Sequence, residues 1–324
     1  MIQKLVWENV KHRPLRTLLS ALLIAVPVTL VLTLVGLSKG MLEDLGRRAK
    51  GVGADIVIRP KGSSFLSLGS APIDERLIEK LLRKEPHVTF ATGIVVQTLS
   101  NGLSSAAGIQ LEEFNQMSGG FRFLQGGPFE TPDDVLIDEY YAKETKAHVG
   151  GTMKLINRSW RIAGIVESGK LNRVFMDLHK LQDLTGNTGK VNQIYLKVDE
   201  AKNIPGVVAA LKEKLVDYPI YSMEEFTSLL TADNIPALSK FIDVMIGISV
   251  FIGFAVVCLS MYMAVLQRTR EIGILKSLGA SKAFLLSIIL REAVLMALAG
   301  AVLGALYPGL RAAGQDPIEA LAYE

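Results

Sequence analysis

The stretch that decides the fold is LLSALLIAVPVTLVLTLVGL, residues 18–37. It contains no charged side chain, and about 20 apolar residues in a helix can cross the hydrocarbon core of a bilayer. Pro27 lies in the middle of the stretch, where neighbouring helices can satisfy the carbonyl that a proline frees, so we expect a kink rather than an end. The stretch therefore predicts a transmembrane helix over residues 18–37.

A cleaved signal peptide is the alternative interpretation, because Arg13 and Arg16 precede the stretch. The apolar run is long for a signal peptide, and no A-x-A-like cleavage site follows it at residues 35–38. An uncleaved span is therefore the preferred prediction.

Two more apolar segments lie near the other end of the chain. Residues 241–266 carry a single charge, Asp243, close to their start, and predict a second transmembrane helix. Residues 283–306 predict a third membrane segment, but Arg291 and Glu292 interrupt it and leave only about 14 uninterrupted apolar residues, which is short for a span. We therefore expect a shortened third segment whose first half is amphipathic or lies at the membrane interface.

Composition excludes some classes of protein. Hydrophobic residues make up 49% of the 324-residue chain and concentrate near both ends, whereas residues 38–240 have the composition of a water-soluble domain. The formal net charge is +3, and no basic stripe with interleaved aromatic residues occurs, so we do not expect binding to nucleic acid. The single cysteine, Cys258, lies in an apolar run and cannot form a disulfide within the chain.

The distribution of lysine and arginine predicts the orientation in the membrane. Basic residues lie before the first predicted span and after the second, at Lys4, Lys11, Arg13, Arg16, Arg268, Arg270, Lys276 and Lys282. The positive-inside rule therefore places the amphipathic N-terminal segment, residues 1–17, and the loop at residues 267–282 in the cytoplasm. Residues 38–240 then form an extracytoplasmic domain. Basic residues at its start compete with this assignment, but long domains translocate largely regardless of charge.

Within residues 38–240, the patterns of strands and helices are mixed. Alternating apolar or β-branched runs predict strands at residues 54–59, 92–99, 135–137, 153–156, 161–166 and 193–198. Helical spacing and helix signals predict helices at residues 73–82, 140–147 and 204–215. The fold class that follows is an α-helical membrane protein with an inserted α+β extracytoplasmic domain.

No catalytic motif occurs in this domain of the sequence. The histidines are scattered without the spacing of metal ligands, and there is neither a G-x-S-x-G nucleophile elbow nor a P-loop. The acidic pairs Asp133-Asp134 and Asp138-Glu139 fit turn residues and helix N-terminal charges better than a catalytic pair. We therefore expect no enzymatic activity, no cofactor and no metal site in this chain.

The loop between the second and third segments, QRTREIGILKSLGASK at residues 267–282, carries the most informative pattern. As a helix, this stretch has apolar residues on one side, namely Ile272, Leu275 and Leu278. Gly279 is a suitable C-terminal stop, and Ser281 is a suitable N-cap for the next helix. Such a helix could dock in a groove of a cytoplasmic partner or lie on the anionic membrane surface, and periodicity alone leaves both interpretations open.

The same loop also carries a family resemblance. RTREIGILKSLGA, residues 268–280, resembles the loop between the second and third membrane helices of MacB/FtsX-type ABC transporter permeases. RPLRTLL at residues 13–19 resembles the start of the family's first helix. Two segments, YPGLRAA (307–313) and DPIEAL (316–321), resemble the family's C-terminal tail. Two others, VLID (135–138) and WRIAGIV (160–166), resemble its MacB-like periplasmic core domain. The likeness covers nearly the whole chain.

In that family the loop forms a coupling helix that contacts the ATP-binding subunit. The resemblance therefore implies that a partner binds at Arg268, Arg270, Glu271, Ile272, Ile274, Leu275, Lys276 and Leu278. It implies a permease subunit that couples ATP hydrolysis by a separate subunit to export or mechanotransmission through the extracytoplasmic domain. The implied partners are that ATP-binding subunit, a second permease in a homodimer or heterodimer, a periplasmic adaptor protein and membrane lipid.

The implied location is the cell inner membrane, with several spans and the large domain outside the cytoplasm. The alternative function is a membrane-anchored sensor or scaffold whose outer domain regulates a periplasmic or cell-wall partner. The presence or absence of a bound ATP-binding subunit distinguishes these two functions.

The chain departs from the family pattern in one place. Family members have four membrane helices, whereas here residues 300–306 run straight into Tyr307, so we expect most of the last transmembrane helix region to be missing. We expect a functional relative to carry an extra apolar span between Gly304 and Tyr307. A single crossing would leave the C-terminal tail, residues 307–324, outside, whereas a re-entrant third segment would keep it inside. Gly300 and Gly304 form a G-x-x-x-G pattern, which is a weak signal of a helix contact.

Overall fold

The computed structural model describes residues 14–63, 73–99, 105–231, 234–267 and 269–313. The chain forms two compact units, of which one comprises Met1–Gly40 with Pro236–Glu324 and the other comprises Met41–Ile235. The first unit is helical, and the second is a mixed domain of helices and strands. The boundaries of the mixed domain lie within a few residues of the extracytoplasmic domain predicted at residues 38–240.

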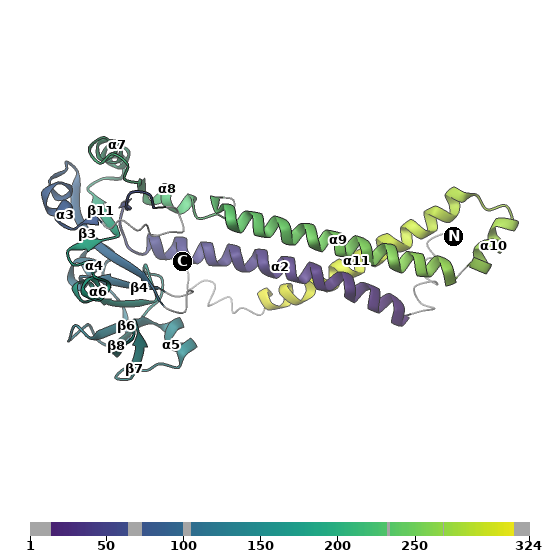
Figure 1. The fold of residues 1–324 in the computed structure, drawn as a ribbon, viewed down its shortest axis with the longest axis horizontal. Helices are drawn as coiled ribbons and strands as arrows, with labels where there is room; N and C mark the ends of the chain where they lie inside the picture. Colours follow the sequence, from purple (N-terminus) through teal and green to yellow (C-terminus); the bar gives the residue numbers. More distant parts are fainter. Residues whose placement is uncertain (1–13, 64–72, 100–104, 232–233, 268, 314–324) are drawn as a thin grey trace. The chain divides into compact units, whose positions relative to one another are not determined.

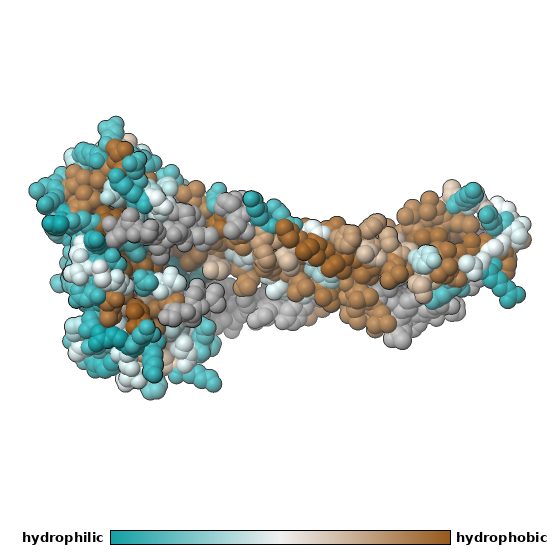
Figure 2. All heavy atoms as spheres, in the orientation of Figure 1, coloured by the Kyte–Doolittle hydropathy of each residue, from teal (hydrophilic) through white to brown (hydrophobic). Residues whose placement is uncertain are grey.

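Within its described residues, the helical unit contains three long helices where the sequence predicts membrane segments. They are α2 (Pro14–Lys50), α9 (Pro236–Gln267) and α11 (Lys282–Ala313), and each is long and apolar enough to cross a membrane. The short helix α10 (Thr269–Ser277) joins α9 to α11 (Figure 1). Figure 2 shows hydrophobic side chains over much of these long helices, as expected for surfaces that contact lipid tails or other membrane helices.

Helix α2 runs through Pro27 without ending, as predicted, and it continues to Lys50, beyond the predicted end of the span at Leu37. Its last turns, from Met41 onward, belong to the mixed domain. Basic side chains in these last turns, including Arg47 and Lys50, favour the C-terminal end of a helix because they complement its dipole.

Helix α11 is longer than the shortened third segment expected at residues 283–306, and it is long and apolar enough to cross a membrane. It is a continuous helix of 32 residues that passes through Arg291, Glu292 and Pro308. Arginine and glutamate are good helix formers, so these two charged residues interrupt the apolar run without ending the helix. Arg291 is exposed, whereas Glu292 is only 5% exposed, so the two charges lie on different faces of the helix.

The mixed domain is built on a ten-stranded sheet with the order β12-β1-β11-β3-β4-β9-β6-β8-β5, and β7 pairs with β8. Its strands are β1 (Ile56–Ile58), β3 (Val88–Thr98), β4 (Ser105–Ile109), β5 (Phe123–Gly126), β6 (Asp134–Asp138), β7 (Thr152–Leu155), β8 (Arg158–Val166), β9 (Val174–Asp177), β11 (Gln193–Val198) and β12 (Ile220–Ser222). A separate two-stranded sheet pairs β2 (Ile73–Asp74) with β10 (Lys190–Val191). In the large sheet β4 pairs with β9, and β6 with β8, in parallel, and the other pairs are antiparallel.

Both faces of the large sheet are buried. Along β6, Val135 and Ile137 face one hydrophobic core and Leu136 faces the other, because successive side chains of a strand point to opposite faces. The first core is covered by α3 (Arg76–Lys80), α5 (Glu139–Thr145), α6 (Leu178–Thr185) and α7 (Ile204–Lys214). The second core is covered by α4 (Leu111–Ser118), α8 (Met223–Ser228) and the end of α2. Helices and mixed strand pairing together confirm the predicted fold class.

Candidate functional site

The loop at residues 267–282 forms helix α10, which has a defined C-terminal end. The N–H of Gly279 donates to the carbonyl of Lys276 at 3.1 Å, and the N–H of Ala280 donates to the carbonyl of Leu275 at 3.0 Å. Gly279 has a φ of +92°, a left-handed conformation that glycine adopts at little cost. These bonds make a Schellman motif, and they confirm the prediction that Gly279 ends the helix.

Helix α11 begins directly after this turn. The Oγ of Ser281 accepts a hydrogen bond from the N–H of Phe284 at 3.2 Å. The carbonyl of Ser281 accepts one from the N–H of Leu285, also at 3.2 Å. Ser281 is therefore the N-cap of α11, as predicted, and α10 is joined to α11 by a short turn of defined geometry.

Helix α10 and its C-terminal turn carry the predicted partner-binding residues, except Arg268, which lies outside the described residues. Glu271 is part of the helix, but the structure describes only its backbone. Of the remaining side chains, Ile272 and Leu275 are half-buried, and Arg270, Ile274, Lys276 and Leu278 are exposed. We call these four exposed residues the α10 patch.

The α10 patch combines apolar surface with positive charge. The exposed fractions of Ile274 and Leu278 are 53% and 80%, which is high for two apolar side chains one helical turn apart. Arg270 adds a positive charge one helical turn before Ile274, and Lys276 adds a second charge on another side of the helix. Such a surface suits a groove with an apolar floor and an acidic margin.

Helix α11 packs closely against α2 through two glycines. A Cβ atom placed on Gly300 would lie 2.6 Å from Ile24 Cβ, and one on Gly304 would lie 2.8 Å from the carbonyl oxygen of Ala25. Real side chains do not come this close, so glycine is needed at both positions. Thr29 Oγ1 donates to the carbonyl of Gly304 at 2.8 Å, a hydrogen bond between the two helices. The G-x-x-x-G pattern is therefore a real helix contact.

The matching face of α2 was missed by the sequence analysis. Ala21, Ala25 and Thr29 are spaced four residues apart, and the exposed fractions of the two alanines are only 3% and 6%. This spacing matches that of Gly300 and Gly304 on α11. A stripe of small residues in the first span was therefore the available signal for this interface.

Helix α11 also contacts α9. Ser260 Oγ of α9 lies 3.9 Å from Met296 Sδ of α11. Buried positions recur every four residues along α11, at Glu292, Met296, Gly300 and Gly304. Helix α10 is thus attached to a helix whose middle, at Met296, Gly300 and Gly304, packs against α9 and α2.

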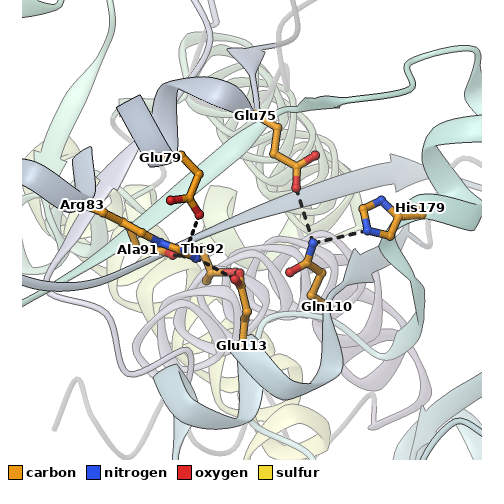
Figure 3. A network of polar contacts seen from close by, with 8 residues as sticks. All are labelled: Glu75, Glu79, Arg83, Ala91, Thr92, Gln110, Glu113 and His179. Atoms are coloured by element: carbon orange, nitrogen blue, oxygen red, sulfur yellow. Dashed lines mark hydrogen bonds and ion pairs between the residues drawn. The ribbon is translucent and has the colours of Figure 1, made fainter. Parts of the chain in front are cut away.

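The mixed domain contains a polar network of charged and amide side chains (Figure 3). Arg83 pairs with Glu79 and with Glu113, whose Oε1 lies 2.6 Å from Arg83 Nη2. Thr92 Oγ1 donates to Glu113 Oε2 at 2.8 Å. Both carboxylate oxygens of Glu113 are therefore engaged, which connects α4 to β3 rather than presenting a general base.

A second part of this network connects α6 to the same region. Gln110 Nε2 lies 3.5 Å from Glu75 Oε1 and 3.4 Å from His179 Nε2. Gln182 Nε2 donates to Glu75 Oε2 at 3.2 Å. Among the residues that the structure describes, no group of three or more His, Cys, Asp or Glu side chains could hold a metal ion. The hydrogen bonds of the network connect the start of α3 to α4 and α6, and α4 to β3, and so support the fold of the domain.

The acidic residues singled out in the sequence are also structural. Asp138 Oδ1 accepts the N–H of Tyr141 at 2.7 Å and caps α5, which confirms its predicted helix N-terminal role. Burial raises the pKa of Asp138, and the hydrogen bond from Tyr141 opposes this shift. Hydrogen bonds from Arg161 hold the pKa of Asp134 well below its ordinary value.

Comparison with known families identifies the class of protein. Residues 17–214 match the family described as MacB-like periplasmic core domain, and residues 244–307 match the family described as FtsX-like permease C-terminal. The chain belongs to the MacB/FtsX-like family of ABC transporter permeases. This confirms the family resemblance.

Individual relatives support the same class. An uncharacterised ABC transporter permease of Methanocaldococcus jannaschii, MJ1507, is 30% identical over 188 residues, which are 54% of this chain and 46% of the relative. The macrolide export ATP-binding/permease protein MacB of Aggregatibacter actinomycetemcomitans is 26% identical over 329 residues, covering 92% of this chain and 50% of the relative. A second permease of Methanocaldococcus jannaschii, MJ0797, is 27% identical and covers 82% of this chain and 72% of the relative.

The chain therefore spans about half the length of the first two of these relatives. Among solved structures, the periplasmic region of MacB from Actinobacillus actinomycetemcomitans matches with a TM-score of 0.43 and 16% identity, covering 56% of this chain and 94% of that structure.

Proposed function

We propose that this chain is a permease subunit of an ABC transporter, driven by a separate ATP-binding subunit that docks on the α10 patch. The observation that carries the proposal is the exposure of Ile274 and Leu278 on a short helix between two helices of membrane-spanning length. Two exposed apolar side chains in line with Arg270, each one helical turn from the next, fit the contact of an amphipathic helix with a groove.

The proposed movement passes from α10 to the helices attached to it. The turn at residues 278–281 connects α10 to α11, and α11 packs on α2 at Gly300 and Gly304. Close-packed contacts do not deform continuously, so a displacement of α10 is expected to move α11 and α2 together. Helix α2 supplies Ala49 to a core of the mixed domain. ATP binding would then bias two states of that domain, for export or mechanotransmission.

The assembly and location are part of the same proposal. The protein is a multi-pass protein of the cell inner membrane, with α10 in the cytoplasm and the mixed domain outside. It forms a homodimer or a heterodimer with a similar permease and works with a periplasmic adaptor protein. The relative MacB is named as a macrolide export protein, which favours export over mechanotransmission.

Leu278→Asp tests the docking surface. Leu278 is 80% exposed, so the substitution should leave the fold intact while it removes apolar contact from the α10 patch. We expect affinity for the ATP-binding subunit to fall at least about tenfold, which corresponds to about 1.4 kcal/mol, and stimulation of ATP hydrolysis to be lost. Pull-down of the solubilised chain with the subunit that co-purifies, followed by an ATPase assay, measures both effects.

Leu124→Asp is the matched control, because Leu124 is 44% exposed on β5 of the mixed domain. The double variant Glu271→Arg with Leu275→Asp extends the test to the rest of α10. Association that survives both Leu278→Asp and this double variant would contradict the assignment of α10. If no ATP-binding subunit co-purifies with the unaltered chain, the sensor or scaffold function is favoured instead.

A further inference from the structure

A cavity of about 430 Å³ lies within the mixed domain, and all its lining residues belong to the unit Met41–Ile235. The last turns of α2, from Met41 to Ala49, form one wall, and α5, α8 and strands β3, β4 and β11 supply much of the rest. Small-molecule sites have volumes of roughly 300–1,000 Å³, so the cavity is large enough for a ligand. None of its lining residues belongs to the polar network of Figure 3.

Two buried arginines make part of this cavity polar. The exposed fractions of Arg48 and Arg59 are 6% and 3%. Arg48 Nη2 pairs with Asp44 Oδ2 at 2.6 Å, but Arg48 Nε is buried and has no hydrogen-bond partner in the described part of the chain. A buried donor without an acceptor is costly, and an acceptor atom of a ligand would satisfy it.

Positive charge exceeds negative charge around the cavity. The carboxylate of Asp44, besides its pair with Arg48, lies 3.5 Å from Arg47 Nη2 and 3.8 Å from Arg173 Nη2. One carboxylate is thus shared by three guanidinium groups. Glu144 also lines the cavity, but it is exposed, so solvent and salt screen its charge. The lining therefore favours an anionic ligand.

The rest of the lining is largely apolar. It includes Leu45, Val96, Phe226 and Leu230. The guanidinium carbon of Arg59 lies 5.8 Å from the centre of the Phe226 ring, within the range of a cation–π interaction. The cavity lining thus includes a cation and an aromatic ring as well as aliphatic side chains. Apolar walls beside buried cations favour a ligand with an alkyl chain over a hydrated inorganic anion.

We propose that this cavity binds an amphiphilic anion, a molecule with an alkyl chain and a carboxylate or phosphate head group. The head group of the ligand accepts a hydrogen bond from Arg48 Nε near the charges of Arg59 and Arg173. The alkyl chain of the ligand packs against the apolar wall of the cavity. The site lies in the mixed domain alone, so the inference stands whether or not an ATP-binding subunit docks on α10.

Ligand competition tests the proposed chemistry. The full chain in phosphatidylcholine nanodiscs is titrated with a dansyl-labelled undecanoic acid, and dansyl fluorescence is compared with that in empty nanodiscs. Octanoate and octyl phosphate should displace the probe, whereas octyltrimethylammonium and inorganic phosphate should leave it bound. The proposal is overturned if either of these last two competes as well as octyl phosphate, or if the probe binds no more than to empty nanodiscs.

Leu45 offers a matched pair of variants, because it lines the cavity on α2 and is 38% exposed. A glutamate at this position would compete with the ligand for Arg48, one helical turn away. We therefore expect Leu45→Glu to weaken probe binding about tenfold and Leu45→Lys to preserve it. Circular dichroism verifies that both variants fold, and equal affinities of the two variants for the probe would overturn the proposal.

Discussion

Asp134→Ala tests whether the first acidic pair supports the fold. The Asp134 side chain is 0% exposed, and its Oδ2 accepts the N–H groups of Glu130 and Thr131, each at 2.8 Å. The carboxylate also accepts from Arg161 Nε at 2.8 Å and from Arg161 Nη2 at 2.9 Å. Truncation to alanine therefore leaves these donors without their acceptor.

The expected loss follows from these contacts. A hydrogen bond to a charged group contributes about 1.5–3 kcal/mol. Arg161 is 45% exposed, so water replaces much of what its guanidinium loses, and the sum over all the bonds is an upper limit. We expect the free energy of unfolding to fall by about 3 kcal/mol, a large part of the stability of an ordinary domain.

The adjacent Asp133 supplies the control. Its side chain is 57% exposed, and its Oδ1 lies 2.9 Å from Lys180 Nζ. Exposed ion pairs contribute little, so Asp133→Ala should lower the free energy of unfolding by no more than about 0.5 kcal/mol. Two neighbouring aspartates should therefore respond very differently to the same substitution.

The effect of Asp134→Ala should depend on pH. Hydrogen bonds from Arg161 are the main cause that holds the pKa of Asp134 well below its ordinary value of 3.8. The stabilisation is complete above that ordinary value, where the unfolded chain is also ionised, and it is lost as the pH falls through the pKa of the folded state. The difference in stability between wild type and Asp134→Ala should therefore shrink at strongly acidic pH.

Urea unfolding followed by Trp160 fluorescence measures these changes. Trp160 is 1% exposed and precedes Arg161 on β8, and its Nε1–H donates to the carbonyl of Leu155 at 2.9 Å. The sequence contains two tryptophans, so a Trp7→Phe background leaves Trp160 as the sole reporter. Equal destabilisation by Asp134→Ala and Asp133→Ala, or a difference that does not change with pH, would refute the reasoning.

Two other substitutions probe the helix contact and the cap of α5. Gly300→Val should destabilise the helical unit by about 1–3 kcal/mol, because its Cβ would lie 2.6 Å from Ile24 Cβ. Gly253→Val, with no described atom within 4 Å of the new Cβ, is the control in thermal unfolding, and equal melting temperatures would argue against the contact. Asp138→Asn keeps a capping side chain but removes a carboxyl group whose pKa is raised by burial. The protonated carboxyl of Asp138 stabilises the fold fully below pH 3.8, its ordinary pKa, and this stabilisation is lost as the pH rises through the pKa of the folded state. The variant should therefore gain stability relative to wild type at neutral pH but not at acidic pH in urea unfolding, and a constant difference would contradict this.

Part of the mixed domain could be predicted from local pattern. Strand β11 coincides with the prediction at residues 193–198, and α7 differs from the helix predicted at residues 204–215 by one residue. The helix predicted at residues 73–82 is shorter, because Ile73 pairs with Val191 across the small sheet instead. Local periodicity therefore succeeded where strand pairing did not override it.

Strand β4 shows why other elements were not predicted. Its residues are mostly small, which is not a strand signal, although the strand lies inside the sheet between β3 and β9. The small residues are required by packing, because a Cβ on Gly108 would lie 2.9 Å from Leu181 Cδ2 of α6. The reason for the composition of β4 thus lies in a helix that is distant in sequence.

The sequence by itself determined the features that need no distant partner. Apolar runs place the helices that are long and apolar enough to cross a membrane, and Gly279 and Ser281 place the end of α10 and the start of α11, because apolar composition and helix capping depend on neighbouring residues. Only the tertiary structure decided that Thr29 meets Gly304, and that Arg48 lines a cavity. Such contacts depend on the shapes of both packed surfaces, and no single segment of sequence contains both.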